Sequence, residues 1–319
     1  RIGFALFVWV SIFGVMVPAQ FWAFAADTFN VKSGQRLFPV IMPGGNLGAL
    51  AGAKTAAVTV AALTPEGLML VATATLLVTV GIAISAAALT PPGSRAASPE
   101  HDARPLNVLG GIGLVLRDRY LLLIALLIVL LNWINSTGEF ILADFVSRHA
   151  DAQIAASGGT LGKDDLVAVF YGEFQFWFTL VGFLIQLFLV SRIYRWVGVA
   201  GALLVMPIVV AIGYGVMVFV PIFSIIRLVK IAENSVDYSL MNTTRQALFL
   251  PVSRDAKYDG KTAIDTFFWR FGDLLQAGVV FAGLNWLQWS PAQFAMLNLA
   301  LAVVWLGLAI AIGREFGRV

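Results

Sequence analysis

Long apolar segments alternate with short polar ones along the chain, and their lengths predict the fold. Nine apolar segments are close to the roughly 20 residues that a helix needs to cross a membrane. Turn-forming residues, such as those at 64–67 and 290–291, separate them. The expected helices are 2–26, 38–62, 67–90, 119–143, 167–190, 196–219, 222–249, 264–287 and 292–313. Because β-barrel spans would be about ten residues long and alternate in polarity, the pattern predicts an all-α integral membrane protein.

The composition excludes several classes of protein. Of 319 residues, 59% are hydrophobic and 12% are charged, whereas soluble domains carry about 25% charged residues. There is no cysteine, and the two histidines, His101 and His149, fall in polar loops. Disulfides, thiolate metal sites, cysteine nucleophiles and Ser-His-Asp triads are therefore excluded. We expect no enzymatic activity, no metal, no cofactor and no nucleic-acid partner, and we expect lipid around the helices.

The basic residues predict which side of the membrane each connection faces. Thirteen of the 21 Lys and Arg residues follow the first, third, fifth, seventh or ninth expected helix. The alternate connections hold two, Arg148 and Lys163. Since cytoplasmic loops are enriched in Lys and Arg, we expect the first set, and the C-terminal Val319, in the cytoplasm. An odd number of helices then places Arg1 outside.

The longest connection, 91–118, begins with two prolines, a glycine and a serine, as flexible linkers do. It separates three expected helices from six. We therefore expect residues 1–90 to be the remaining part of an N-terminal helical bundle, 91–118 a cytoplasmic linker and 119–319 a C-terminal six-helix bundle. A six-plus-six transporter without its first three helices has this pattern. A natural nine-helix protein is the alternative.

The helix expected at 222–249 is unusually polar for a membrane span. Six of its polar side chains lie within about 80° of one line: Arg227, Lys230, Asn234, Asp237, Asn242 and Arg245. Ionisable residues inside a span are functional candidates, so this stripe predicts the lining of an aqueous cavity. Mutually satisfied charges that fix helix packing are the alternative, and Lys230 is spaced to pair with Glu233.

Two further helices carry polar groups. The helix at 119–143 presents Asn132, Asn135, Ser136, Thr137 and Glu139 on or near one face. Glu139 is either a proton carrier or substrate contact, or a residue near the outer interface that faces water. In the helix at 264–287, Arg270 and Asp273 are three residues apart, which predicts a structural ion pair.

Three collinear groups of residues between positions 9 and 275 carry a family resemblance. They are Phe21 to Ala25 with Gln35 to Pro39 and Gly45 to Gly48; Arg119 and Tyr120 running on to Asn135 and Glu139; and Asp237 to Arg245 with Leu250, Pro251, Lys257, Tyr258, Gly260, Lys261 and Ala263 to Asp265. These groups resemble, in order, the fourth-to-fifth helix region, the seventh helix, and the tenth helix with its following loop of ATP/ADP translocase-type nucleotide transporters. That family is similar to the major facilitator superfamily.

The resemblance implies a major-facilitator-like bundle of twelve helices, of which this chain supplies helices four to twelve. Glu139 and Arg245 match charged positions of the family. Asn234 and Asp237, however, stand where the nucleotide exchangers have lysines, and each lost cation weakens the attraction for a triphosphate. The resemblance therefore implies a bacterial translocase-like branch rather than a true nucleotide exchanger.

We expect a secondary-active transporter, of antiporter type and in a bacterial inner membrane, that moves a small anionic solute by alternating access. The solute would be a nucleotide or another phosphorylated or organic anion. The expected substrate-binding residues are Asn135, Glu139, Lys230, Asn234, Asp237, Asn242 and Arg245. Arg245 and Lys230 would hold the anion, and Glu139 or Asp237 would couple protons. A non-transporting subunit or scaffold with protein partners in a larger membrane complex is the alternative.

Overall fold

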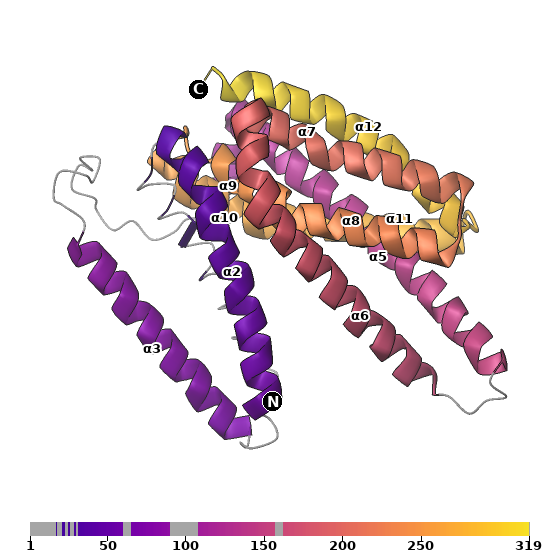
Figure 1. Cartoon of the computed structure of the whole chain (residues 1–319). Coiled ribbons are helices and arrows are strands. Elements are labelled where there is room, and N and C mark those ends of the chain that lie inside the picture. The colour runs from indigo at the N-terminus through magenta and orange to yellow at the C-terminus, as the bar shows by residue number, and fades with distance from the viewer. Residues whose placement is uncertain are drawn as a thin grey trace. The chain divides into compact units, whose positions relative to one another are not determined.

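The computed structural model describes residues 31–59, 65–89, 108–156 and 162–318, with five isolated positions before them. Every regular element in these ranges is a helix (Figure 1), so the expected all-α fold is confirmed there. The elements, with π-helical turns labelled η, are α2 (Val31–Thr59), α3 (Pro65–Leu89), α4 (Val108–Arg117), α5 (Arg119–Ala156), α6 (Lys163–Leu184), η1 (Ile185–Leu189), α7 (Val190–Phe219), α8 (Phe223–Val236), η2 (Asp237–Met241), α9 (Asn242–Leu248), η3 (Ala256–Gly260), α10 (Lys261–Ala263), η4 (Ile264–Phe268), α11 (Trp269–Asn285) and α12 (Pro291–Phe316). Most of the expected helix 2–26 and linker residues 91–107 lie outside the described residues.

The chain divides into two compact units. Residues 1–40 and 106–319 form one, and residues 41–105 form the other. The larger unit contains the polar positions considered below, and the smaller one contains α3, whose apolar side chains, such as Leu70 and Leu77, are largely exposed. The expected division at 91–118 remains a prediction.

Helix α5 forms the centre of the larger unit. It contacts α11 and α12, and α12 in turn lies along α7 (Figure 1). Apolar α5 side chains such as Ile124, Leu127 and Ile128 are fully buried in these contacts. At Gly272 a β-carbon would lie 2.8 Å from the Val129 carbonyl oxygen, so only a glycine lets α11 approach α5 this closely.

Three helical segments are long and apolar enough to span a membrane among the residues that the structure describes. They are Arg119–Ala156, Val169–Phe219 and Pro291–Phe316. The chain is therefore a multi-pass membrane protein. The larger number of nine spans, the cytoplasmic C-terminus and the relation to helices four to twelve remain predictions.

One chain reversal lies later than expected. The basic segment between the expected helices 167–190 and 196–219 is helical, and the helix continues from Lys163 through η1 into α7. The break falls at Gly198, with φ 67° and ψ −174°. Residues 191–197 contain no glycine or proline, so they continue the helix, whereas glycine adopts a positive φ at little cost.

Two other connections are also helical. The helix expected from residue 264 begins before η3, so Lys257 and Lys261 lie on a helix rather than in a loop. Residues 108–117 of the expected linker form the apolar helix α4, which contacts η3 and α10. At Gly111 a β-carbon would lie 3.2 Å from the Ala263 β-carbon. Burial of this apolar face against the helix explains why the segment is not an extended linker.

A hydrogen-bond defect in α2 is satisfied by a side chain from η1. Pro43 has no amide hydrogen, so the carbonyl of Pro39, four residues earlier, lacks its regular helical donor. The fully buried Gln186 donates its Nε2 to that carbonyl at 3.1 Å. Thr243 of α9 donates to the Gln186 Oε1 at 3.1 Å. This chain of bonds ties the start of α2 to the helices that carry the polar residues.

Candidate functional site: a charged cluster between helices

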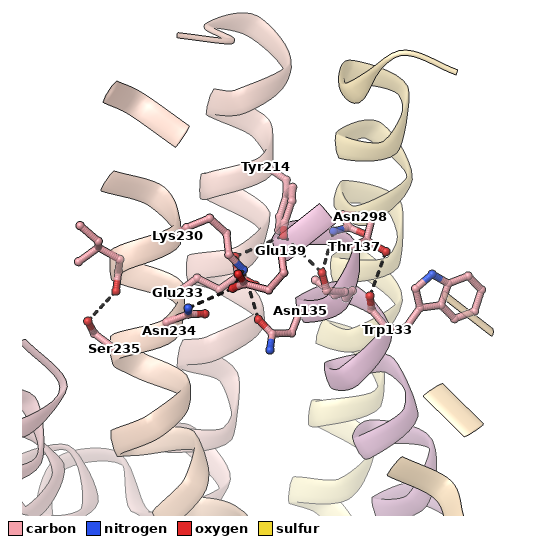
Figure 2. Close-up of polar contacts among 12 residues, drawn as sticks. Trp133, Asn135, Thr137, Glu139, Tyr214, Lys230, Glu233, Asn234, Ser235 and Asn298 are labelled. Carbon is pink, nitrogen blue, oxygen red and sulfur yellow. Dashed lines mark hydrogen bonds and ion pairs between the residues drawn. The ribbon is translucent and has the colours of Figure 1, made fainter. Parts of the chain in front are cut away.

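Lys230 of α8 lies at the centre of a polar cluster inside the larger unit (Figure 2). Its side chain is fully buried, and its Nζ lies 3.1 Å from Glu233 Oε2 and 3.3 Å from Glu139 Oε1. It also donates a hydrogen bond to Asn135 Oδ1 at 3.2 Å. An ammonium carries three donors, and these three acceptors match that number.

The two carboxylates of this cluster differ in their access to solvent. The Glu233 side chain is 1% exposed, whereas that of Glu139 is 40% exposed. Asn234 donates its Nδ2 to Glu139 Oε1 at 3.1 Å. The cluster therefore has a sealed side at Glu233 and an open side at Glu139.

Two residues of other helices support the sealed side. The Tyr214 hydroxyl of α7 lies 3.3 Å from Glu233 Oε2 and 3.4 Å from the Ile134 carbonyl oxygen. Asn298 of α12 donates its Nδ2 to the same carbonyl at 3.0 Å. Four helices, α5, α7, α8 and α12, thus meet around Lys230.

A glycine makes room for this arrangement. A β-carbon at Gly138 of α5 would lie 2.7 Å from Lys230 Nζ and would also collide with the Tyr214 hydroxyl. The absence of a side chain at this position lets both polar groups lie against α5. The spacing along α8 also contributes, because residues three or four apart share one helix face. Lys230 therefore lies on the same face as Glu233 and Asn234.

Two oxygen atoms that α8 contributes to the cluster have no hydrogen-bond partner among the described residues. They are Glu233 Oε1 and Asn234 Oδ1, and both are buried. A buried polar atom without a partner costs about 1–3 kcal/mol. A water, an ion or a ligand bound beside such an atom would supply the missing partner.

A second polar cluster joins α5 to α11. Asn132 donates its Nδ2 to Asp273 Oδ1 at 2.6 Å and to the Trp269 carbonyl oxygen at 2.9 Å. Ser136 donates to the same carboxylate at 3.2 Å. The expected ion pair between Arg270 and Asp273 forms, at 3.3 Å, with an Arg270 side chain that is 77% exposed.

The C-terminal end of the predicted polar stripe makes contacts of its own. Arg245 donates to Asn242 Oδ1 at 3.2 Å, and its guanidinium lies 5.0 Å from the centre of the Trp269 ring. Asp237 interacts electrostatically with both Arg245 and Lys230. Arg245 follows Lys230 by 15 residues on one continuous helical run, which at about 1.5 Å per residue places it about 22 Å farther along that run.

The end of the stripe at Arg227 also lies apart. Arg227 pairs with Glu173 of α6 at 2.9 Å and lies 5.5 Å from the centre of the Phe170 ring. Both charges line a cavity of about 190 Å³, beside the stacked rings of His149 and Phe223.

The structure thus brings together four of the seven expected binding residues, Asn135, Glu139, Lys230 and Asn234, while their role in binding remains a prediction. Sequence reasoning missed Glu233 as a member of the site, although its spacing from Lys230 indicated a pair. Tyr214 and Asn298 carried only the weak signal of a polar side chain in an apolar helix. No group of three or more metal-ligating side chains lies together in the described ranges.

Comparison with known proteins gives one kind of relative. The chain is 24% identical to ADP,ATP carrier protein 1 of Chlamydia pneumoniae over 358 aligned positions, which cover 98% of this chain and 67% of that protein. The resemblance to ATP/ADP translocase-type carriers is confirmed. ADP,ATP carrier protein 1 of Chlamydia trachomatis serovar D is 25% identical over 173 positions, as is that of Chlamydia muridarum.

The relationship to these carriers is distant and partial in length. The chain spans about two thirds of the first carrier and about a third of the other two. No family model and no solved structure matches the chain. The charged cluster is therefore interpreted from its own geometry.

Proposed function

We propose that this chain forms part of a secondary carrier that moves a small phosphorylated or organic anion across a membrane by alternating access. One observation carries the proposal: a fully buried lysine, Lys230, lies among polar groups between apolar helices. Burying an ammonium in a helical membrane protein is costly, so such residues are retained mainly where they bind or relay charge. The similarity to ADP,ATP carriers supports transport as that role.

The groups around Lys230 favour a phosphate or carboxylate as the recognised part of the solute. Lysine binds phosphate as a point charge, and Asn135 and Asn234 add neutral side chains that can donate hydrogen bonds. Arg245 over Trp269 supplies a second cation on the same run of helices, with an aromatic face beside it.

The number of cations limits the charge of the solute. Asn234 and Asp237 occupy positions where the resemblance implies lysines, and the described cluster around Lys230 holds two carboxylates, those of Glu139 and Glu233. Each missing cation weakens the attraction for a polyanion in a low-dielectric cavity. We therefore expect inorganic phosphate, a nucleoside monophosphate or diphosphate, or an organic acid to bind better than ATP.

The test uses the full-length protein that contains this chain, purified and reconstituted in liposomes. Uptake or exchange of radiolabelled phosphate, AMP, ADP, ATP and dicarboxylates is measured, together with thermal shifts for the same compounds. The double variant Lys230→Met/Glu233→Gln removes the buried cation without leaving its buried partner charged. We expect it to lower uptake by about 10- to 100-fold, the effect of losing one charge-assisted hydrogen bond.

Lys163→Met is the matched control, because Lys163 forms an ion pair with Asp151 and its side chain is 42% exposed. We expect this variant to transport normally. If the double variant transports as well as the wild type, Lys230 is not the anion ligand. If no compound shifts the melting temperature or is transported, and the protein co-purifies with others in fixed stoichiometry, the subunit alternative replaces transport.

A further inference from the structure

The charges around Lys230 do not balance in the structure. One ammonium faces two carboxylates, those of Glu139 and Glu233, at 3.3 and 3.1 Å. The cluster therefore carries one net negative charge when all three groups are ionised. A site with this charge is unsuited to an anion unless a positive charge arrives as well.

We propose that the anion enters this site together with a proton, which Glu139 takes up as its carboxylate leaves Lys230. The proposal rests on the transport function proposed above and adds the coupling ion and the residue that carries it. In this scheme the anionic oxygen of the solute replaces Glu139 Oε1 beside Lys230 Nζ. Lys230 keeps an ionised partner, Glu233, throughout.

The size of the electrostatic penalty favours this scheme. An anion with one negative charge, added beside Lys230, would change the net charge of the unprotonated cluster from −1 to −2. At an effective dielectric constant of about 20, two like charges about 4 Å apart repel by about 4 kcal/mol. Protonation of one carboxylate removes that repulsion and returns the occupied site to a net charge of −1.

Glu139, rather than Glu233, is placed to receive the proton. Its side chain is 40% exposed, whereas that of Glu233 is 1% exposed and lies against Lys230 and Tyr214. Glu139 comes from α5 and Lys230 from α8, so the Glu139–Lys230 pair can separate by a small shift between two helices. Glu233 is on the same helix as Lys230 and does not separate in this way.

Asn234 can accommodate both protonation states. Its Nδ2 donates to the Glu139 carboxylate, and its Oδ1 is buried without a partner in the described part of the chain. A protonated carboxyl group becomes a donor. Rotation of the amide by half a turn would then direct Oδ1 to the new O–H and give that oxygen its partner.

Titratable side chains from several helices lie around Glu139. Among the described residues, those that interact with it include Lys230, Glu233 and Tyr238 from α8 and η2, Tyr171 from α6 and Tyr214 from α7. The negative charge of Asp237 repels that of Glu233, and the positive charge of Arg245 attracts that of Asp237. From α12, Asn298 contributes a neutral amide to the Ile134 carbonyl beside the cluster.

The step balances without any other reactant. A proton passes from water on the entry side to a Glu139 oxygen, the Lys230–Glu139 pair opens, and the anion takes its place. On the opposite side the anion and the proton both return to water, and the ion pair forms again. One anion and one proton therefore move together in each cycle.

The experiment measures accumulation in proteoliposomes driven by a proton gradient alone, with the membrane potential held at zero by potassium and valinomycin. The probe is whichever of phosphate, AMP or ADP the wild type exchanges. For one proton per anion, a gradient of about one pH unit, acidic outside, should concentrate the probe about tenfold, because one pH unit is a tenfold ratio of proton activity. Glu139→Gln, which keeps the shape and an oxygen acceptor for Lys230, should show no accumulation.

The matched control is Glu173→Gln, which makes the same chemical change at the ion pair with Arg227 outside the cluster. It should accumulate the probe as the wild type does. Wild-type exchange that is unaffected by the gradient, or accumulation that survives in Glu139→Gln, overturns proton coupling while transport stands. A wild type that neither exchanges nor accumulates any probe overturns the transport function itself.

Discussion

Helix α5 carries two polar clusters on neighbouring faces, about 60° apart at 100° per residue. Asn135 and Glu139 contact Lys230, and Asn132 and Ser136 contact Asp273. In the first cluster the cation is completely buried between two carboxylates. In the second, neutral donors hold the carboxylate and the cation, Arg270, extends into the surroundings.

The two clusters differ in how strongly each charge depends on its neighbours. Near Asp273 the carboxylate fixes α11 against α5, and the exposed Arg270 adds little, since exposed ion pairs contribute about 0–1 kcal/mol. Near Lys230 the charges depend on one another, because removal of one leaves an uncompensated charge away from water. The cluster around Lys230 is consequently suited to exchange partners, and the cluster around Asp273 is suited to hold α5 and α11 together.

The largest expected effect follows from removing the buried cation alone. Lys230→Met leaves Glu233 buried without its partner, so we expect it to lower the free energy of unfolding by about 3–5 kcal/mol. The measurement is unfolding by SDS in mixed detergent micelles. Adding Glu233→Gln should recover most of the loss. A single variant as stable as the wild type would contradict the assignment of a charged Lys230–Glu233 pair.

An intermediate effect is expected for the two glycines that border these clusters. Gly272→Ala places a methyl group against the Val129 backbone carbonyl, which cannot move aside, and we expect a loss of about 1–3 kcal/mol in the same assay. Gly138→Ala presses instead on the movable ends of Lys230 and Tyr214. It should cost less stability but reduce anion uptake. The reverse order of stability losses would contradict the described packing.

The smallest effect is expected at the exposed ion pair. Arg270→Ala should change the free energy of unfolding by no more than about 1 kcal/mol, because the Arg270 side chain is mostly exposed. Transport should be unchanged. A loss of several kcal/mol, or of transport, would show that the second cluster is as interdependent as the first.

Much of the helical architecture could be predicted from the apolar pattern. The helix expected at 222–249 corresponds to α8, η2 and α9, which together run from Phe223 to Leu248, and that expected at 292–313 corresponds to α12. The breaks were less predictable. Polar and basic residues around Arg192 and Lys257 indicated loops, but a polar residue tolerates a helix, and the chain turns only where Gly198 permits a positive φ.

Members of the candidate site could be predicted from the sequence, but the contacts between them could not. Helical spacing placed Lys230 near Asn234, whereas Arg245 lies about four turns farther along the same helical run. The contact of Lys230 with Glu139 joins residues that are 91 positions apart. Such a contact depends on how far two helices slide and rotate against each other.

The sequence by itself determined that this protein is helical, lies in a membrane and carries ionisable groups within its apolar segments. It also carried the resemblance to ATP/ADP translocase-type carriers, because residue order and type survive without coordinates. Only the tertiary structure decided which of those charges meet, which are buried and which reach solvent. The physical reason is that helix formation and membrane insertion depend on local apolar content, whereas the electrostatics of the site depend on distances of a few ångströms between different helices.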